Sequence, residues 1–188
     1  MIPKYVALFG GFLLFFSPLQ AQELVDNPEF VSWSKFKKGT SLIVKSVTST
    51  EKEASEVIIT STLLDAGTEK VVIQTTSVVK RKDKDFKSDP EKREILRLIP
   101  LPKGLSKEEF AAGKPPGTTE EGTETLKIGG LELKAKWYKY NADVAKTKIS
   151  AKKWFSPEIP GTIVKSEMTT TGDFASTIKL ELVELKKP

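Results

Sequence analysis

The residues of this chain that could do chemistry are serines, lysines and carboxylates, because the sequence contains no histidine and no cysteine. A Ser-His-Asp triad, a Cys-His pair and a histidine-ligated zinc site are therefore excluded. The spacing Ser-x-x-Lys, which can supply a nucleophile and a base, occurs at six positions. The Ser-Asp-Asn and Lys-Thr-Gly motifs of enzymes that use this pair are missing, and lysine is abundant enough to produce the spacing by chance. We therefore predict that the protein is not an enzyme.

Three aspartates, Asp83, Asp85 and Asp89, are spaced much as in a calcium-binding loop. Lys84 and Lys87 intervene and would repel a cation, and no glycine stands at the sharp turn. This segment is therefore interpreted as a solvated run of charges. We expect no metal ion and no cofactor.

Five aromatic residues form the candidate ligand-binding set: Trp33, Phe36, Trp137, Trp154 and Phe155. Two interpretations are open. The aromatic side chains line a cavity for a lipid-like ligand between a curved sheet and a helix, or they form an ordinary core, because aromatic residues dominate core burial in any domain. The element from Trp154 to Gly161 holds two prolines, which predicts a fixed turn between two strands.

A short helix is expected near the start of the domain. Asn27 is a suitable N-cap, and Pro28 suits the first helical position. Phe30, Trp33 and Phe36 follow at three-residue spacing, which places them near one face. The sequence therefore predicts a short amphipathic helix ahead of the strands.

Most of the remaining sequence predicts strands. Segments rich in valine, isoleucine and threonine are separated by short spacers, which favours antiparallel neighbours. Gly129-Gly130 is typical of a two-residue hairpin, and the alternation after it predicts a strand with one buried face. The predicted strands are residues 41–49, 57–64, 70–80, 123–128, 131–138, 147–155, 162–170 and 174–182. The fold class is therefore mainly β (α+β): a curved antiparallel meander sheet or unclosed β-barrel of about eight strands with one or two short helices.

The segment 81–121 interrupts this pattern. Its first part is nearly all charge, residues 95–99 form a short apolar run, and Ser106 is placed to cap one or two helical turns. Loops of this length are uncommon in compact domains. We expect a charged, mobile excursion from a single β-rich domain spanning residues 22–188, with residues 95–99 as a strand or packing anchor.

The first twenty-one residues have the pattern of a secretory signal peptide. Lys4 precedes an apolar run over residues 6–16, and Ala21 offers a small residue for cleavage. The run is shorter than the roughly 20 residues that a membrane-spanning helix needs. We expect an exported protein, periplasmic or extracellular, with no transmembrane anchor after cleavage.

The formal net charge is +5, and most of the basic residues are lysines. Nucleic-acid readers favour arginine, whose planar fork makes bidentate contacts, so we expect no nucleic-acid partner. Attraction to an anionic envelope component through the Lys-rich segment 81–97 remains an alternative.

The stretch 120–138 and the element Trp154-Phe155-Ser156-Pro157-Glu158-Ile159-Pro160-Gly161 resemble a family of uncharacterised exported bacterial proteins. The pattern Trp-x-Ser-Pro-x-x-Pro-Gly and its hairpin setting are also similar to the unclosed β-barrels of the LolA/LolB lipoprotein carriers. That likeness implies a half-barrel fold with helical cover and an apolar or acyl ligand. Two hypotheses follow: a binding protein for such a ligand, or a non-enzymatic interaction module of the cell envelope.

Overall fold

The computed structural model describes residues 23–81, 84–172 and 175–188. The helices are α1 (Pro28–Trp33) and α2 (Lys107–Ala111). The strands are β1 (Leu24–Asp26), β2 (Ser41–Ser49), β3 (Ala54–Ala66), β4 (Lys70–Arg81), β5 (Lys84–Lys87), β6 (Glu91–Leu96), β7 (Leu98–Pro100), β8 (Thr118–Ile128), β9 (Leu131–Val144), β10 (Thr147–Phe155), β11 (Ile163–Thr171) and β12 (Ser176–Lys186).

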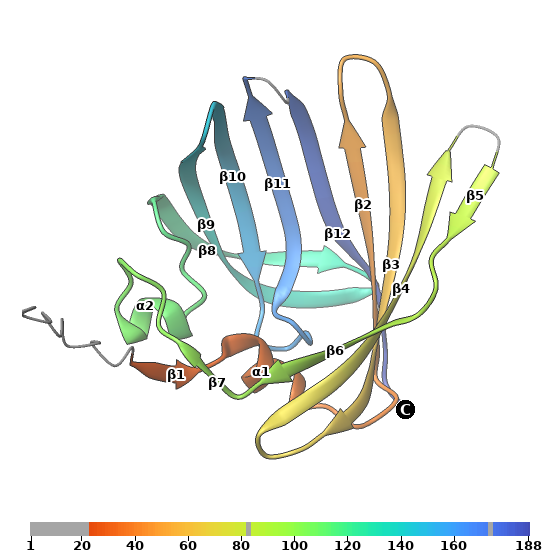
Figure 1. Cartoon of the computed structure of the whole chain (residues 1–188), viewed down its shortest axis with the longest axis vertical. Helices are drawn as coiled ribbons and strands as arrows, with labels where there is room; N and C mark the ends of the chain where they lie inside the picture. The colour runs from red at the N-terminus through yellow and green to blue at the C-terminus, as the bar shows by residue number, and fades with distance from the viewer. Residues whose placement is uncertain (1–22, 82–83, 173–174) are drawn as a thin grey trace, which may run out of the picture.

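A ten-stranded antiparallel sheet dominates the molecule (Figure 1). Its order is β5-β4-β3-β2-β12-β11-β10-β9-β8, with β6 also paired to β4, and β1 and β7 form a separate pair. The sheet curves without closing, so the predicted class, a curved mainly β sheet with short helices, is confirmed. The twelve strands exceed the expected eight because the charged segment after residue 81 contributes β5, β6 and β7, and β1 precedes α1.

The charged segment lies against the sheet rather than apart from it over its described residues. β5 and β6 both pair with β4, and Ile95 is buried there as the expected anchor. Arg93 donates to Glu29 at 3.0 Å, which ties β6 to α1. Ser106 caps α2 in a reciprocal capping box with Glu109. The mobility of this segment stays a prediction.

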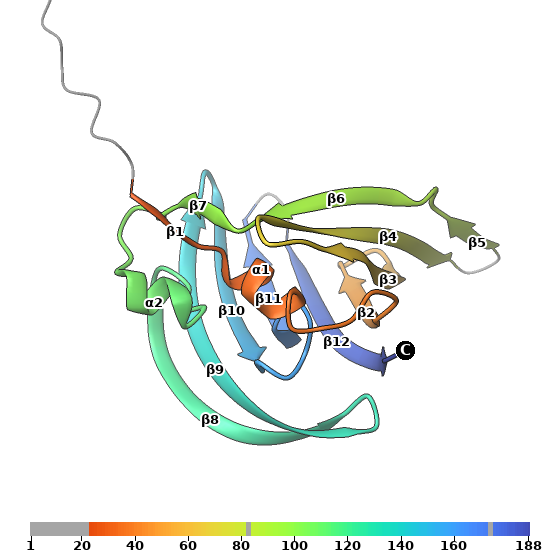
Figure 2. The same ribbon diagram turned by 90° about the horizontal axis from the view of Figure 1, so that it is seen from below.

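The β8–β9 hairpin bends away from β10 and passes behind β11 and β12 in the view of Figure 1, and Figure 2 shows its wide arc on the side opposite β6. Gly129 and Gly130 have φ angles of 59° and 73°, the two positive values that a tight hairpin turn of this kind requires. A Cβ atom on Gly129 would lie 3.1 Å from Leu182 Cγ, so the hairpin tip is in close contact with β12. The predicted hairpin is thus present, and its tip packs against β12.

Helix α1 lies inside the curve of the sheet (Figure 2). Asn27 Oδ1 accepts from the Glu29 backbone N–H at 3.0 Å, and Pro28 stands in the first turn, as predicted. Phe30 and Trp33 are buried in the main core. The helix therefore fills the lower part of the half-barrel with its apolar face.

The corner between β10 and β11 holds α1 in place. Ser156, Ile159 and Pro160 are fully buried in it. Ser32 Oγ on α1 donates to the Ile159 carbonyl oxygen at 2.9 Å. Gly161 has a φ of 73°, which allows the chain to turn beneath the helix. The proline-containing element predicted as a fixed turn is a structural corner that supports the helix.

Residues 1–22, which include the predicted signal peptide, lie outside the described part of the chain, as does Asp83 of the aspartate run. No helix among the described residues is both long and apolar enough to cross a bilayer.

Candidate ligand-binding site

One face of the sheet can be followed across strands, because residues paired in an antiparallel ladder point to the same side. On β12, Leu182 pairs with Val44 of β2, and Leu180 pairs with Ser46 of β2 and Ser166 of β11. On the same face, Leu63 of β3 and Ile73 of β4 belong to one core cluster with the side chains of α1. This face is therefore the inner, concave one.

The lower half of the concave face is core. Leu42, Leu63, Ile73 and Leu182 are all less than a tenth exposed and belong to one cluster with the side chains of α1. Helix α1 contacts β4 and β6 at this level. A ligand cannot reach these residues without displacing the helix.

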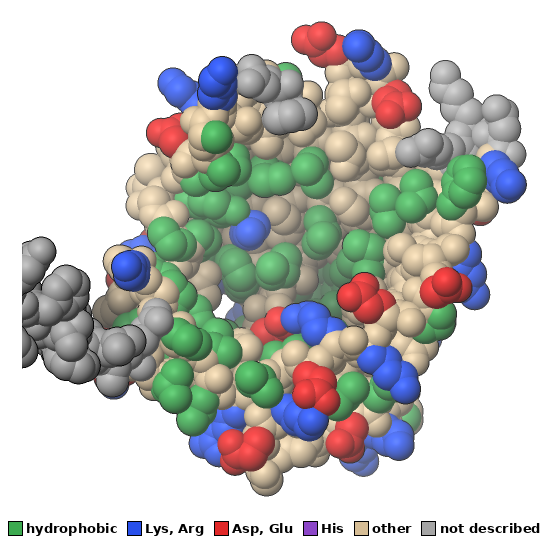
Figure 3. Space-filling model, viewed as in Figure 1, with side chains coloured by type: hydrophobic (Ala, Val, Ile, Leu, Met, Phe, Trp, Pro, Cys, Tyr) green, Lys and Arg blue, Asp and Glu red, His purple; other side chains and the backbone are tan. Residues whose placement is uncertain are grey.

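The upper half of the concave face is open. Its apolar side chains are half-buried although they point to the inside of the curve: Val57, Ile59, Val79, Ile149, Met168, Ile178 and Leu180. Figure 3 shows hydrophobic side chains lining a hollow on this side of the molecule. Exposed apolar surface gathered on one concave face is typical of a ligand-binding site.

Small hydroxyl side chains separate the apolar ones on this face. Leu180 has serines as both of its cross-strand neighbours, Ser46 and Ser166. Ile178 has Thr48 on one side and Met168 on the other. Because serine side chains are shorter than leucine, Leu180 projects farther from the sheet than its neighbours do. An apolar chain can therefore lie beside it. Hydroxyl groups add weak polar contacts and no net charge.

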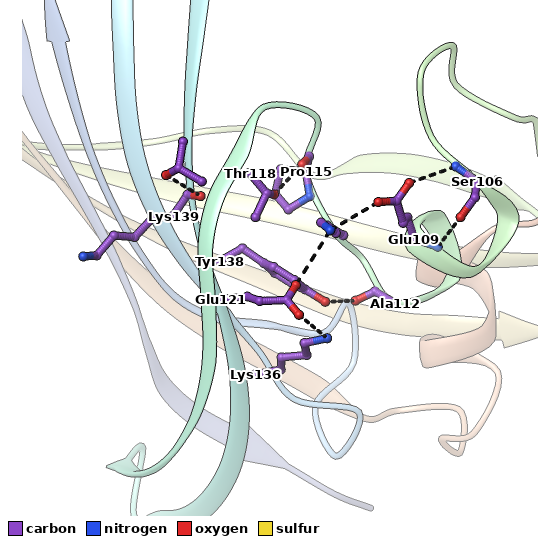
Figure 4. A network of polar contacts seen from close by, with 11 residues as sticks. Ser106, Glu109, Ala112, Pro115, Thr118, Glu121, Lys136, Tyr138 and Lys139 are labelled. Carbon is purple, nitrogen blue, oxygen red and sulfur yellow. Dashed lines mark hydrogen bonds and ion pairs between the residues drawn. The ribbon is translucent and has the colours of Figure 1, made fainter.

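A network of polar contacts joins α2 and the segment after it to β8 and β9 (Figure 4). The Tyr138 hydroxyl donates to the Ala112 carbonyl oxygen at 3.2 Å. Lys114 forms ion pairs with Glu109 at 3.2 Å and with Glu121 at 3.9 Å. The backbone N–H of Ser106 donates to Glu109, and this bond is the main cause of the lowered pKa of that carboxyl. These contacts fix the segment after α2 over Tyr138.

The structure divides the five predicted aromatic residues. Trp33 and Trp154 are 2% and 4% exposed and lie in the core. Phe155 is half-buried and meets Tyr138 edge to face with ring centroids 5.8 Å apart. Trp137 is half-buried and pairs with Trp154 on the face opposite to Tyr138. The five therefore do not converge on one cavity, and their role as ligand contacts stays a prediction.

Trp137 and Trp154 enclose a lysine instead. Lys152 Nζ lies 4.1 Å from the ring centroid of Trp137 and 4.4 Å from that of Trp154. It also pairs with Glu124 at 3.5 Å. The Trp154 indole N–H donates to Glu124, which lowers the pKa of that carboxyl. This cation–π stack is a complete structural unit in which each charge has a partner.

Phe36, the fifth aromatic residue, lines a separate cavity of about 320 Å³ at the base of the molecule. The other lining residues are Lys35, Lys37, Thr40, Lys187 and Pro188. At the upper rim, a second cavity of about 380 Å³ lies between the ends of β2 and β12 and is lined mainly by hydroxyl side chains. Among the described residues, no group of three or more carboxylates is placed to hold a metal ion.

Sequence reasoning expected a ligand in the curve of the sheet, but it assigned the contacts to aromatic residues and missed the aliphatic side chains of this face. The useful signal was the alternation Ile178, Leu180, Leu182 on β12. Alternation predicts one apolar face, but it does not say which part of that face a helix covers.

Comparisons with known proteins give no family assignment: no family model and no curated protein match this sequence. Solved structures with similar folds include a protein described as an exported protein with a YmcC-like fold from Bacteroides fragilis, 12% identical, with a TM-score of 0.46 over 81% of this chain and 97% of that one. A protein described as a lipoprotein from Parabacteroides distasonis is 12% identical, with a TM-score of 0.43 over 80% and 96%. A LolA superfamily protein from Nitrosomonas europaea is 7% identical, with a TM-score of 0.22 over 87% and 94%. The likeness to LolA-like half-barrels is therefore distant, and at these scores it carries no conclusion about ligand, partner or location.

Proposed function

We propose that this protein is an exported, non-enzymatic binding protein of the cell envelope that holds an apolar or acyl ligand on the concave face of its sheet. The observation that carries the proposal is the half-buried apolar surface above α1, which faces a hollow (Figure 3). A ligand that covered this surface would remove it from water, at roughly 25 cal/mol per Å² of apolar area.

The predicted aromatic residues have different roles in this proposal. Phe155 contacts the ligand, because it lies at the wall of the concave face beside Tyr138. Trp33 and Trp154 hold the framework from within the core, Trp137 stacks on Lys152, and Phe36 lies at the base.

The test is a fluorescence titration with N-phenyl-1-naphthylamine, a neutral apolar probe that brightens in apolar surroundings. We expect a saturable rise in emission that 1-dodecanol reverses. Ile59 and Ile58 provide a matched pair, since both are half-buried on β3 and they point to opposite faces. Ile59→Ala is expected to weaken probe binding, and Ile58→Ala is expected to leave it unchanged. Equal effects of the two substitutions, or no saturable binding, would refute the proposal.

The second candidate function is contact with an anionic envelope component through the segment 81–97. Lys84, Lys87 and Lys92 are exposed there, and none has a carboxylate partner among the described residues. Arg93 and Arg97, by contrast, are paired with acidic residues near α1. Such binding would weaken as salt is raised, because exposed charges are screened over about 10 Å at 0.1 M.

A further inference from the structure

A lysine lies on the apolar concave face. Lys153 of β10 pairs with Ser166 of β11 on one side and with Tyr138 of β9 on the other, so it shares the face that carries Leu180. Lys153 is half-buried. Lys148, on the same strand, points to the opposite face and is exposed.

The charge of Lys153 has no acidic partner in the described part of the chain. Its contact there is with the ring of Tyr140, with Nζ 5.4 Å from the centroid. The acid nearest on this face in the strand register, Glu121, is already paired with Lys114 and Lys136. A cation on a partly desolvated apolar surface is unfavourable unless an anion accompanies it. Lys153 therefore presents a positive charge on this face that an anionic ligand can neutralise.

The apolar surface continues from Lys153 across the sheet. Successive cross-strand pairs lead from Lys153 through Ser166 to Leu180, then through Ser46 to Val57. Neighbouring strands lie about 4.8 Å apart, so Leu180 is roughly 10 Å from Lys153 along this row and Val57 is roughly 19 Å away. One extended alkyl chain can therefore cover the apolar residues while its head group stays at the lysine.

We propose that the ligand is a single-chain anionic amphiphile, whose carboxylate or phosphate pairs with Lys153 while its alkyl chain lies across Leu180 toward Val57. This inference rests on the proposed function and adds the charge, the orientation and the anchoring residue of the ligand. Lysine supplies a point charge that accepts either anion, so the head group is defined by its charge.

The test is displacement of N-phenyl-1-naphthylamine by three twelve-carbon compounds: dodecanoate, dodecyl phosphate and neutral 1-dodecanol. We expect both anions, or the one whose head group fits, to displace the probe at roughly tenfold lower concentration than dodecanol, as one charge-assisted hydrogen bond implies. Lys153→Met should remove this preference and leave dodecanol unchanged, because methionine keeps the apolar stem. Lys153→Arg should retain most of the preference, and Lys148→Met, on the opposite face, should retain all of it.

Each outcome has a definite meaning. Equal displacement by all three compounds in the wild-type protein, or a preference that survives Lys153→Met, would overturn the anionic assignment and leave the apolar site standing. A probe that does not bind at all would overturn the proposed function and this inference with it. A preference for only one of the two anions would support the inference and identify the head group.

Discussion

Truncation of two leucines on the same face of β12 should affect different properties. Leu182→Ala should mainly lower stability, and Leu180→Ala should lower it less and also weaken ligand binding. Leu182 is 2% exposed beneath α1 and the β8–β9 hairpin, whereas Leu180, two residues earlier, is half-buried in the open hollow. Replacing either with alanine removes three carbon atoms, about 2.4 kcal/mol of transfer free energy when the side chain is fully buried. For Leu182 the resulting cavity raises the cost, so Leu182→Ala should lower the free energy of unfolding by about 2–5 kcal/mol.

Leu180→Ala should cost about 1.6 kcal/mol of stability, because up to about a third of this residue is already exposed in the free protein. A ligand that covers the exposed third would contribute up to about 0.8 kcal/mol through Leu180, so its removal should weaken acyl binding by up to about fourfold. Urea denaturation measures the first quantity and probe titration of the folded protein the second. Leu182→Ala should retain its affinity where it is folded. If Leu180→Ala destabilised as much as Leu182→Ala and left binding unchanged, the division of this face into core and site would be refuted.

Three further changes test the elements around the site. Ser32→Ala removes the buried hydrogen bond to the Ile159 carbonyl and should lower stability by about 1–3 kcal/mol in urea denaturation; no loss would mean that the corner does not hold α1. Glu124→Gln should lower the melting temperature at pH 7, and the difference from wild type should shrink as the pH falls below about 4.5. The pKa of this carboxyl is lowered in the folded state, so its stabilisation is present above the unfolded value and is lost on acidification; a difference that is constant with pH would contradict this. Gly122→Ala would place a Cβ atom 2.7 Å from Trp137 Cζ2, so the indole must move, and its fluorescence spectrum should shift; an unchanged spectrum would contradict the packing.

The local features of the fold were predictable because their signals lie within a few residues. Asn27 and Pro28 start α1, Ser106 starts α2, and Gly129-Gly130 turns the hairpin, all as expected from side-chain capping and positive φ angles. The alternation along β9 and β12 likewise predicted strands with one apolar face.

The charged strands were not predictable from composition. The residues Lys84–Lys87 are charged except for Phe86, which is typical of a loop. They nevertheless pair with β4, because backbone hydrogen bonds do not depend on side-chain polarity and an exposed outer strand tolerates charges on both faces.

The candidate site could not be predicted because it depends on register between strands far apart in the sequence. Leu180 lies between Ser46 and Ser166 only once the order β2-β12-β11 is known. Lys153 stands beside Lys152 in the sequence, yet the two point to opposite faces, one to the hollow and one to a tryptophan stack. No pattern of residue types distinguishes them.

The most direct test of the central claim is native mass spectrometry, with organic extraction, of the mature protein purified from a secreting host. The account predicts a co-purified amphiphile that is lost on denaturation, and a chain that begins near Gln22. It also predicts that the bound fraction falls for Leu180→Ala and Lys153→Met, while Ile58→Ala retains it. The account would be contradicted by a monodisperse protein that carries no bound compound and takes up neither dodecanoate nor dodecanol when they are added.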